Sequence, residues 1–165
     1  MRTLLLPFLA VFLFSACSTH KKYNALSKYH SNNYTIQEHN TIKQRLYQSY
    51  KKWAGVHYCY GGADHSGIDC SALVQQIYKE AFHLNIPRTT KQQITIGTAV
   101  VKKDLKEGDL LFFKTSYKGL HSGIYLQNGN FIHSSSKYGV TLSNLKNPYW
   151  KKRYYKARRL INHPF

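Results

Sequence analysis

Apolar positions recur at helical spacing in the first half of the chain's folded part and at strand spacing in the second half. In residues 38–54 the apolar side chains of Ile42, Leu46, Tyr50 and Trp53 stand three or four positions apart. This spacing places them along one face of a helix. We therefore expect an amphipathic helix with one buried stripe.

A second helix is expected over residues 70–82, where Leu73, Ile77 and Ala81 recur at every fourth position. Asp69 stands directly before this stretch and is a favoured N-cap residue. The pattern therefore predicts a capped helix with one buried face, whose first residue is a cysteine.

A weak capping-box pattern at Thr90 and Gln93 predicts a short helix over residues 91–96. After Gly97, short apolar runs separated by turn residues indicate strands instead. The expected strands are residues 99–101, 110–113, 122–126, 130–134, 140–142 and 154–161. Helices followed by strands are typical of an α+β fold. We expect one domain over residues 38–165, with helices packed on a five- to six-stranded antiparallel sheet.

The N-terminus has the pattern of an export signal. Leu4 to Phe14 is an apolar run too short to span a membrane and typical of a signal peptide. The small residues that follow, just before Cys17, resemble the lipobox of bacterial lipoproteins. Residues 1–16 are therefore predicted to be removed and Cys17 to be lipidated. The alternative is ordinary secretion with cleavage near Ala16.

Residues 17–37 are polar and lack apolar periodicity, so we expect a flexible tether between the anchor and the domain. Ser18, rather than an aspartate, follows the predicted lipidated cysteine. This indicates the outer membrane if the organism has two membranes. The predicted location is the cell envelope, on the outer membrane and facing the periplasm.

The chain carries a formal net charge of +17, from 24 lysines and arginines against 7 acidic residues. Such an excess is typical of nucleic-acid binding, but an exported chain meets little nucleic acid. Anionic wall polymers or lipid headgroups are then the expected counter-charges. Alternatively, the charge only keeps an aromatic-rich surface soluble.

The candidate nucleophile is Cys70, the first residue of the second predicted helix. Free N–H groups and the positive end of the helix dipole favour a thiolate at that position. The alternative is that Cys70 serves only as a small apolar residue at the start of the helix. A disulfide with Cys59 is conceivable in an oxidising compartment, but it would disable the nucleophile, so we expect both thiols to be free.

His121 and His133 are the candidate partners of the thiol, which needs a base and a group that orients the base. They lie on predicted strands joined by one hairpin. A two-residue turn, Asn128-Gly129, would place them on opposite faces of the sheet. A three-residue turn, Gln127-Asn128-Gly129 with a G1 bulge, would place them on the same face. A site that uses both histidines is therefore expected to need an odd-length turn.

No metal and no cofactor are expected at these residues. A zinc site needs three or four ligands at short spacing, and one cysteine with two hairpin histidines lacks the usual pair of closely spaced cysteines. His65, in the loop before the second helix, is a weaker candidate for the base.

Several motifs in this order resemble the NlpC/P60 family. They are residues 58–62 (YCYGG), 69–74 (DCSALV), 87–90 (PRTT), 108–113 (GDLLFF), 121–126 (HSGIYL) and 131–134 (FIHS). The resemblance covers residues 40–160. It departs from the family pattern at Cys59, where a bulky or basic residue is usual, and at Ala72, where glycine is usual.

The resemblance implies a papain-like cysteine peptidase core that acts on peptidoglycan stem peptides, typically at the bond between γ-D-glutamate and the diamino acid. It makes Cys70 the nucleophile, His121 its base and His133 the residue that orients the base. Oxyanion stabilisation and substrate positioning fall to Tyr58, Asp69, Ser71 and Arg88. For Asp69 a role limited to capping, and for Arg88 a structural tie to the loop, remain open alternatives.

The sequence is therefore interpreted as a lipid-anchored peptidoglycan endopeptidase with a Cys-His-His thiol mechanism. Its expected partners are stem peptides and, through its lipid, a membrane; nucleic acid is not expected, and the protein is expected to be a monomer. The rival interpretations are a non-catalytic wall-binding module on the same fold and, less favoured, an acyl transferase.

Overall fold

A computed structural model of the protein describes residues 41–116 and 119–162. The predicted leader at 1–16, the lipidated Cys17 and the tether at 17–37 lie outside the described residues and stay predictions. Within the described ranges no helix is long and apolar enough to cross a membrane.

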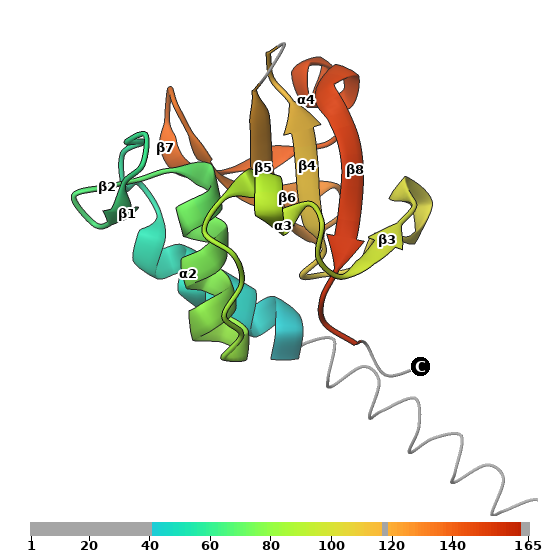
Figure 1. The fold of residues 1–165 in the computed structure, drawn as a ribbon, viewed down its shortest axis with the longest axis horizontal. Coiled ribbons are helices and arrows are strands. Elements are labelled where there is room, and N and C mark those ends of the chain that lie inside the picture. Colours follow the sequence, from blue (N-terminus) through green and yellow to red (C-terminus); the bar gives the residue numbers. More distant parts are fainter. Residues whose placement is uncertain (1–40, 117–118, 163–165) are drawn as a thin grey trace, which may run out of the picture. The chain divides into compact units, whose positions relative to one another are not determined.

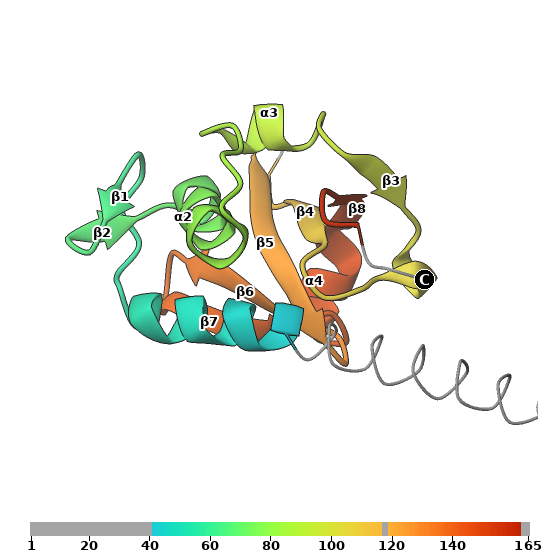
Figure 2. The same cartoon turned by 90° about the horizontal axis from the view of Figure 1, so that it is seen from below.

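Residues 41–53 are helical and α2 is Cys70–Phe82, so both long helices expected from the apolar spacing are confirmed. The Asp69 side chain caps α2 by accepting a hydrogen bond from the Ala72 N–H at 2.7 Å. At the other end His83 adopts the left-handed conformation, with a φ of 55°, which ends the helix. Figures 1 and 2 both show residues 41–53 beside α2, and the Trp53 indole N–H donates to the Glu80 carboxylate at 3.0 Å.

The short helix expected at 91–96 is wrong in its bounds, because α3 is Thr90–Gln93. Thr89, not Thr90, is the N-cap, and its side chain accepts from the Gln92 N–H. The helix therefore begins one residue earlier than expected and ends at Gln93, with Ile94 as its C-cap. Periodicity alone gave no sign of two further short elements, the 3₁₀ helix η1 (Lys102–Asp104) and the helix α4 (Pro148–Arg153).

Within the described residues a six-stranded antiparallel sheet has the order β3-β8-β4-β5-β6-β7 (Figure 1). This confirms the expected α+β class and the antiparallel sheet. The last strand of the chain, β8, lies between β3 and β4. The strands are β3 (Thr98–Val100), β4 (Leu110–Lys114), β5 (Leu120–Gln127), β6 (Asn130–Ser135), β7 (Gly139–Asn144) and β8 (Tyr154–Arg159). A separate two-stranded ribbon, β1 (Ala63–Asp64) and β2 (Gly67–Ile68), precedes α2.

The sheet buries apolar side chains on both faces. On one face, helix 41–53 and α2 pack against residues such as Ile124 and Ile132. On the other face, Phe113 and Phe131 pack with Leu145 and with the partly buried Trp150 of α4. Strand alternation explains the division, because neighbouring residues of β6 point to opposite faces.

The hairpin between β5 and β6 has the expected register but not the expected turn. Gln127 pairs with Asn130, so the turn has two residues, Asn128 and Gly129, with φ of 53° and 84°. Positive φ at both positions is what a type I′ turn requires. The register then shifts between Tyr125 and Gln127, which leaves one extra residue in β5. This bulge, rather than an odd-length turn, restores the register that the paired histidines need.

A buried ion pair ties the end of β8 to the turn before β4. The Asp109 carboxylate is fully buried and accepts from Arg159 Nε and Nη2, each at 2.7 Å. It also accepts from the Lys106 backbone N–H at 2.8 Å. Both oxygens of the buried carboxylate therefore have hydrogen-bond partners.

We predict that Arg159→Ala lowers the free energy of unfolding by about 3 kcal/mol or more, because it leaves the buried Asp109 charge unpaired. Urea denaturation measures this loss. The matched control is Lys52→Ala, which removes an exposed ion pair with Glu80 and should cost about 1 kcal/mol at most. Equal losses in the two variants would contradict this account of the pair.

Candidate active site

Cys70 is the first residue of α2, and its thiol is free and nearly buried, with 8% of the residue exposed. Burial by itself raises the pKa of the Cys70 thiol. Hydrogen bonding to His121 and the charge of that imidazole outweigh burial and lower the pKa from 9.0 to about 7. The Ser122 backbone and the Thr90 side chain add to the lowering. A large fraction of the thiol is therefore ionised near neutral pH, which makes Cys70 a good nucleophile.

His121, the candidate base, is the first of three polar side chains that contact one another across β5, β6 and β7. His121 Nε2 lies 3.0 Å from His133 Nδ1, and His133 Nε2 lies 2.9 Å from Ser143 Oγ. The structure thus brings together Cys70, His121 and His133, the three residues named from the sequence, and adds Ser143. Ser143 carries no local sequence signal, because only the pairing of β7 with β6 places it beside His133.

His133 is held in the neutral form. Its burial, and secondarily the charge of His121, lower its pKa from 6.5 to about 3. A neutral imidazole has one donor and one acceptor nitrogen. When His121 carries a proton on both nitrogens, His133 must accept at Nδ1 and donate at Nε2 to Ser143. The hydrogen bonds then favour a single tautomer of His133 and hold the His121 ring in a fixed orientation.

Trp150 of α4 covers both histidines. Its ring stacks on His121 at 5.5 Å between centroids and meets His133 edge-on at 4.8 Å. Phe113 and Phe131 pack against the same indole. Sequence reasoning missed Trp150, and the available signal was the Asn147-Pro148 pair, which starts α4 as N-cap and first helical residue.

Two hydroxyl groups lie near the thiol. Thr90 Oγ1 is 3.8 Å from Cys70 Sγ and 3.4 Å from Ser122 Oγ, and both hydroxyl residues are buried. Neither was singled out from the sequence for a role beside the thiol. Thr90 thus gives the nearly buried sulfur a polar neighbour, and Ser122 in turn lies beside Thr90.

Asp69, Ser71 and Arg88 form one network beside the nucleophile. Arg88 pairs with both oxygens of Asp69, at 3.0 and 2.8 Å, and also donates to Ser71 Oγ at 3.0 Å. Its Nη2 reaches the carbonyls of Gly61 and Gly62 as well. Burial tends to raise the pKa of Asp69, but the bonds from Arg88, Ala72 and Ser71 lower it overall. The network fastens the glycine loop to the start of α2.

Cys70 lies between two open pockets of about 640 and 560 Å³, and Tyr58 lines both of them. Burial, and then the negative charge of Cys70, raise the pKa of Tyr58. Its phenol therefore keeps its proton and can donate a hydrogen bond near the thiol. The larger pocket includes His121, His133 and Trp150, and the smaller one includes Asp69, Ser71 and Arg88. The two pockets share Tyr58, Tyr60, Cys70 and Leu120 among their lining residues, and together they are called the groove below.

The remaining candidates lie elsewhere. Cys59 is exposed and free, so Cys59 and Cys70 do not form a disulfide in this structure. His65 stacks on Trp53 with centroids 4.2 Å apart, and the His121 side chain occupies the position next to the thiol. Within the described residues no group of three His, Cys, Asp or Glu side chains could hold a metal ion.

Comparison with known proteins agrees with this geometry. Residues 55–159 match the NlpC/P60 family. The chain is 43% identical over 121 residues to murein DD-endopeptidase MepS/murein LD-carboxypeptidase from Escherichia coli, covering 73% of this chain and 64% of that protein. It is 40% identical over 157 residues to the probable endopeptidase NlpC from Escherichia coli, covering 94% of this chain and 97% of that one.

A crystal structure of an NlpC/P60 family protein from Bacillus cereus is similar as well. Its TM-score is 0.64 at 32% identity, over 71% of this chain and 39% of that one. The chain thus spans just under two thirds of MepS but nearly all of NlpC. The family match covers more than half of the sequence and includes the thiol, both histidines and the capping aspartate. The chain therefore belongs to the NlpC/P60 family.

Proposed function

We propose that this protein is a peptidoglycan endopeptidase that hydrolyses amide bonds of stem peptides through the Cys70 thiolate. The observation that carries the proposal is the position of Cys70 at the start of α2, hydrogen-bonded to His121 and lining an open groove, where its pKa is lowered to about 7. The names of the relatives support the substrate class, since MepS is a murein endopeptidase and NlpC a probable endopeptidase. The bond between γ-D-glutamate and the diamino acid, or a cross-link, is the proposed target.

In the first step the Cys70 sulfur attacks the scissile carbonyl carbon, and the carbonyl oxygen takes up the negative charge. The backbone N–H of Cys70 is one of those that a helix leaves unpaired at its start. It can donate to this oxyanion, with the Tyr58 phenol as a second donor. The C–N bond then breaks as His121 gives its proton to the leaving amine, which yields a thioester and a free amine.

In the second step water attacks the thioester carbon. His121, now neutral, removes a proton from that water, and the C–S bond breaks to release a carboxylic acid. The thiolate and the protonated imidazole are thereby restored. His133 does not take the proton in either step, because its pKa of about 3 keeps it neutral; it orients His121 by accepting a hydrogen bond at Nδ1.

The groove has features that suit a sugar-bearing substrate. Tyr60 is 91% exposed and lines both pockets beside Cys70, and Tyr138 is 66% exposed at the larger pocket. Such rings can stack on sugar faces. Because Arg88 already donates to Asp69, Ser71 and the glycine loop, we assign it to holding the loop rather than to a substrate carboxylate.

The location is part of the proposal. A lipid on Cys17, in an outer membrane facing the periplasm, would hold the domain beside the wall through the tether at 17–37. A chain that acts there needs no nucleic acid and no second copy, so we propose a monomer.

We predict that the wild-type domain releases new stem-peptide fragments from purified peptidoglycan and that Cys70→Ser does not. Serine keeps the size of the side chain but lacks an ionised sulfur, so the rate should fall by more than about a thousandfold. Mass spectrometry of the digests shows the fragments and the bond that is cut. A reduced wild-type protein that binds the wall without releasing fragments would instead be a binding module.

We predict that His133→Ala lowers kcat by up to about a hundredfold, because the His121 ring loses its fixed orientation. His133→Asn retains an acceptor toward His121 and should keep more activity than His133→Ala. KM should change little in both variants, since His133 is only 1% exposed. Undiminished turnover in His133→Ala would remove this residue from the site.

We predict that the reactivity of Cys70 rises with pH through a midpoint near 7, because the thiolate is the reacting form. The rate of iodoacetamide labelling measures this in a Cys59→Ser background, where the exposed second thiol is absent. In the same background His121→Ala should move the midpoint upward, since burial then acts without the imidazole charge. Matching midpoints in the two proteins would contradict the pairing of Cys70 with His121.

A further inference from the structure

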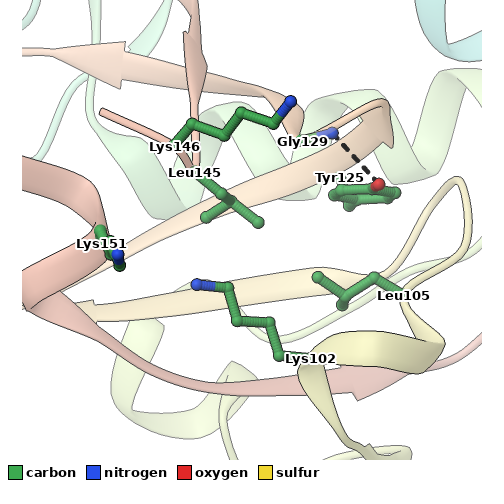
Figure 3. A pocket seen from close by; sticks show the side chains of 7 residues that line it. All are labelled: Lys102, Leu105, Tyr125, Gly129, Leu145, Lys146 and Lys151. Atoms are coloured by element: carbon green, nitrogen blue, oxygen red, sulfur yellow. Dashed lines mark hydrogen bonds between the residues drawn. The ribbon is translucent and has the colours of Figure 1, made fainter. Parts of the chain in front are cut away.

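A third pocket, of about 350 Å³, lies outside the groove that contains the thiol. Figure 3 shows its side chains, with three lysines around an apolar floor. It is lined by Lys102, Leu105, Tyr125, Gly129, Leu145, Lys146 and Lys151. None of these residues is acidic, so the pocket has a positive rim without a counter-charge of its own.

The three lysines come from separate elements and are all exposed. Lys102 belongs to η1, Lys146 follows β7 and Lys151 belongs to α4. Among the described residues no ion pair holds the ammonium groups of Lys146 and Lys151, and that of Lys102 lies 5.0 Å from the centre of the Tyr154 ring. Three like charges around one hollow raise the local potential and attract anions.

The floor of the pocket is apolar and fixed in place. Leu145 is buried, and its backbone N–H donates to the Gly129 carbonyl at 2.8 Å. The Tyr125 hydroxyl in turn accepts from the Gly129 N–H at 3.2 Å, as the dashed line in Figure 3 shows. A ligand that fits both parts carries an anionic group on a short aliphatic body.

This pocket lies on the same face of the sheet as the two histidines. Tyr125 and His121 are four residues apart on β5 and so point to one side, roughly 13 Å apart along the strand. One segment, residues 143–151, contributes to both pockets. Ser143 and Trp150 line the larger pocket of the groove, and Lys146 and Lys151 line the lysine pocket. An extended peptide of about four residues spans such a distance.

We propose that the pocket of Lys102, Lys146 and Lys151 is an accessory subsite that binds a free carboxylate of peptidoglycan while the same polymer occupies the groove at Cys70. The proposal rests on the proposed function. A stem peptide joined through a γ-carboxyl keeps its α-carboxylate free, so it supplies an anion, and its aliphatic side chains match the floor of Leu105 and Leu145.

The shape of the site favours this occupant over a lipid surface. Membrane-binding segments present larger basic clusters, of about four to eight lysines and arginines, to a flat charged surface. Here three lysines surround a hollow that can hold a small group, and the segment 143–151 contributes residues both to the hollow and to the groove. A second contact on one polymer also raises the overall affinity by making the second binding event intramolecular.

The test compares two triple variants, each in a Cys70→Ser background that binds without cleaving. One replaces Lys102, Lys146 and Lys151 by Gln. The matched control replaces Arg45, Lys51 and Lys79 by Gln and removes the same charge; these residues are exposed on helix 41–53 and α2, on the opposite face of the sheet. Sedimentation with insoluble peptidoglycan at low salt measures retention, and sedimentation with phosphatidylglycerol vesicles measures lipid binding.

We expect the pocket variant to lose about tenfold in affinity for peptidoglycan, as three exposed ion pairs together are worth about that much. The control should lose much less. With Cys70 restored, the pocket variant should show a raised KM for peptidoglycan and an unchanged kcat, since the lysines lie far from the sulfur.

Equal losses in the two triple variants would overturn the subsite, because overall charge would then explain binding. So would a pocket variant that loses vesicle binding and keeps peptidoglycan binding, which would make a lipid headgroup the ligand. If the pocket variant binds and cleaves as the wild type does, the subsite fails and the proposed function stands. If the wild type releases no fragments while the pocket lysines still govern retention, the proposed function fails and the subsite stands.

Discussion

The Asp69 carboxylate fixes the start of α2, and the geometry of the site depends on that position. It accepts from the Ala72 N–H and pairs with both Nη atoms of Arg88, and Arg88 Nη2 also donates to the glycine loop. The cap leaves Cys70 as the first helical residue, a position whose backbone N–H has no partner within the helix. The same arrangement therefore favours the thiolate and, in the proposed mechanism, provides a donor for the oxyanion.

A second constraint is the neutral state of His133. A carboxylate in its place would stabilise a protonated His121 more strongly, whereas a buried imidazole with a pKa of about 3 can only accept and orient. Ser143 and the Trp150 ring complete its surroundings. His133 therefore fixes the orientation of His121 but stabilises its protonated form less than a carboxylate would.

The short segment from β7 through α4 connects this site to the basic pocket. It supplies Ser143 and Trp150 to the one and Lys146 and Lys151 to the other. A polymer bound across it would be held at the reacting bond and at a free carboxylate together. In this proposal the lysines of the pocket bind an anionic ligand, in addition to the general effect of the net positive charge on solubility.

The sequence by itself determined the elements whose cause is local. Helical spacing gave helix 41–53 and α2, the aspartate before Cys70 gave the cap, and the motifs identified the family. Tertiary structure decided the rest. The bulge in β5 set the pairing register that puts His121 and His133 on the same face. The pairing of β7 with β6 brought Ser143 to the site, and the packing of α4 on the sheet brought Trp150 there. These contacts join residues that are far apart in the sequence. No local sequence pattern specifies them, because they depend on how the strands of the whole sheet pair and twist.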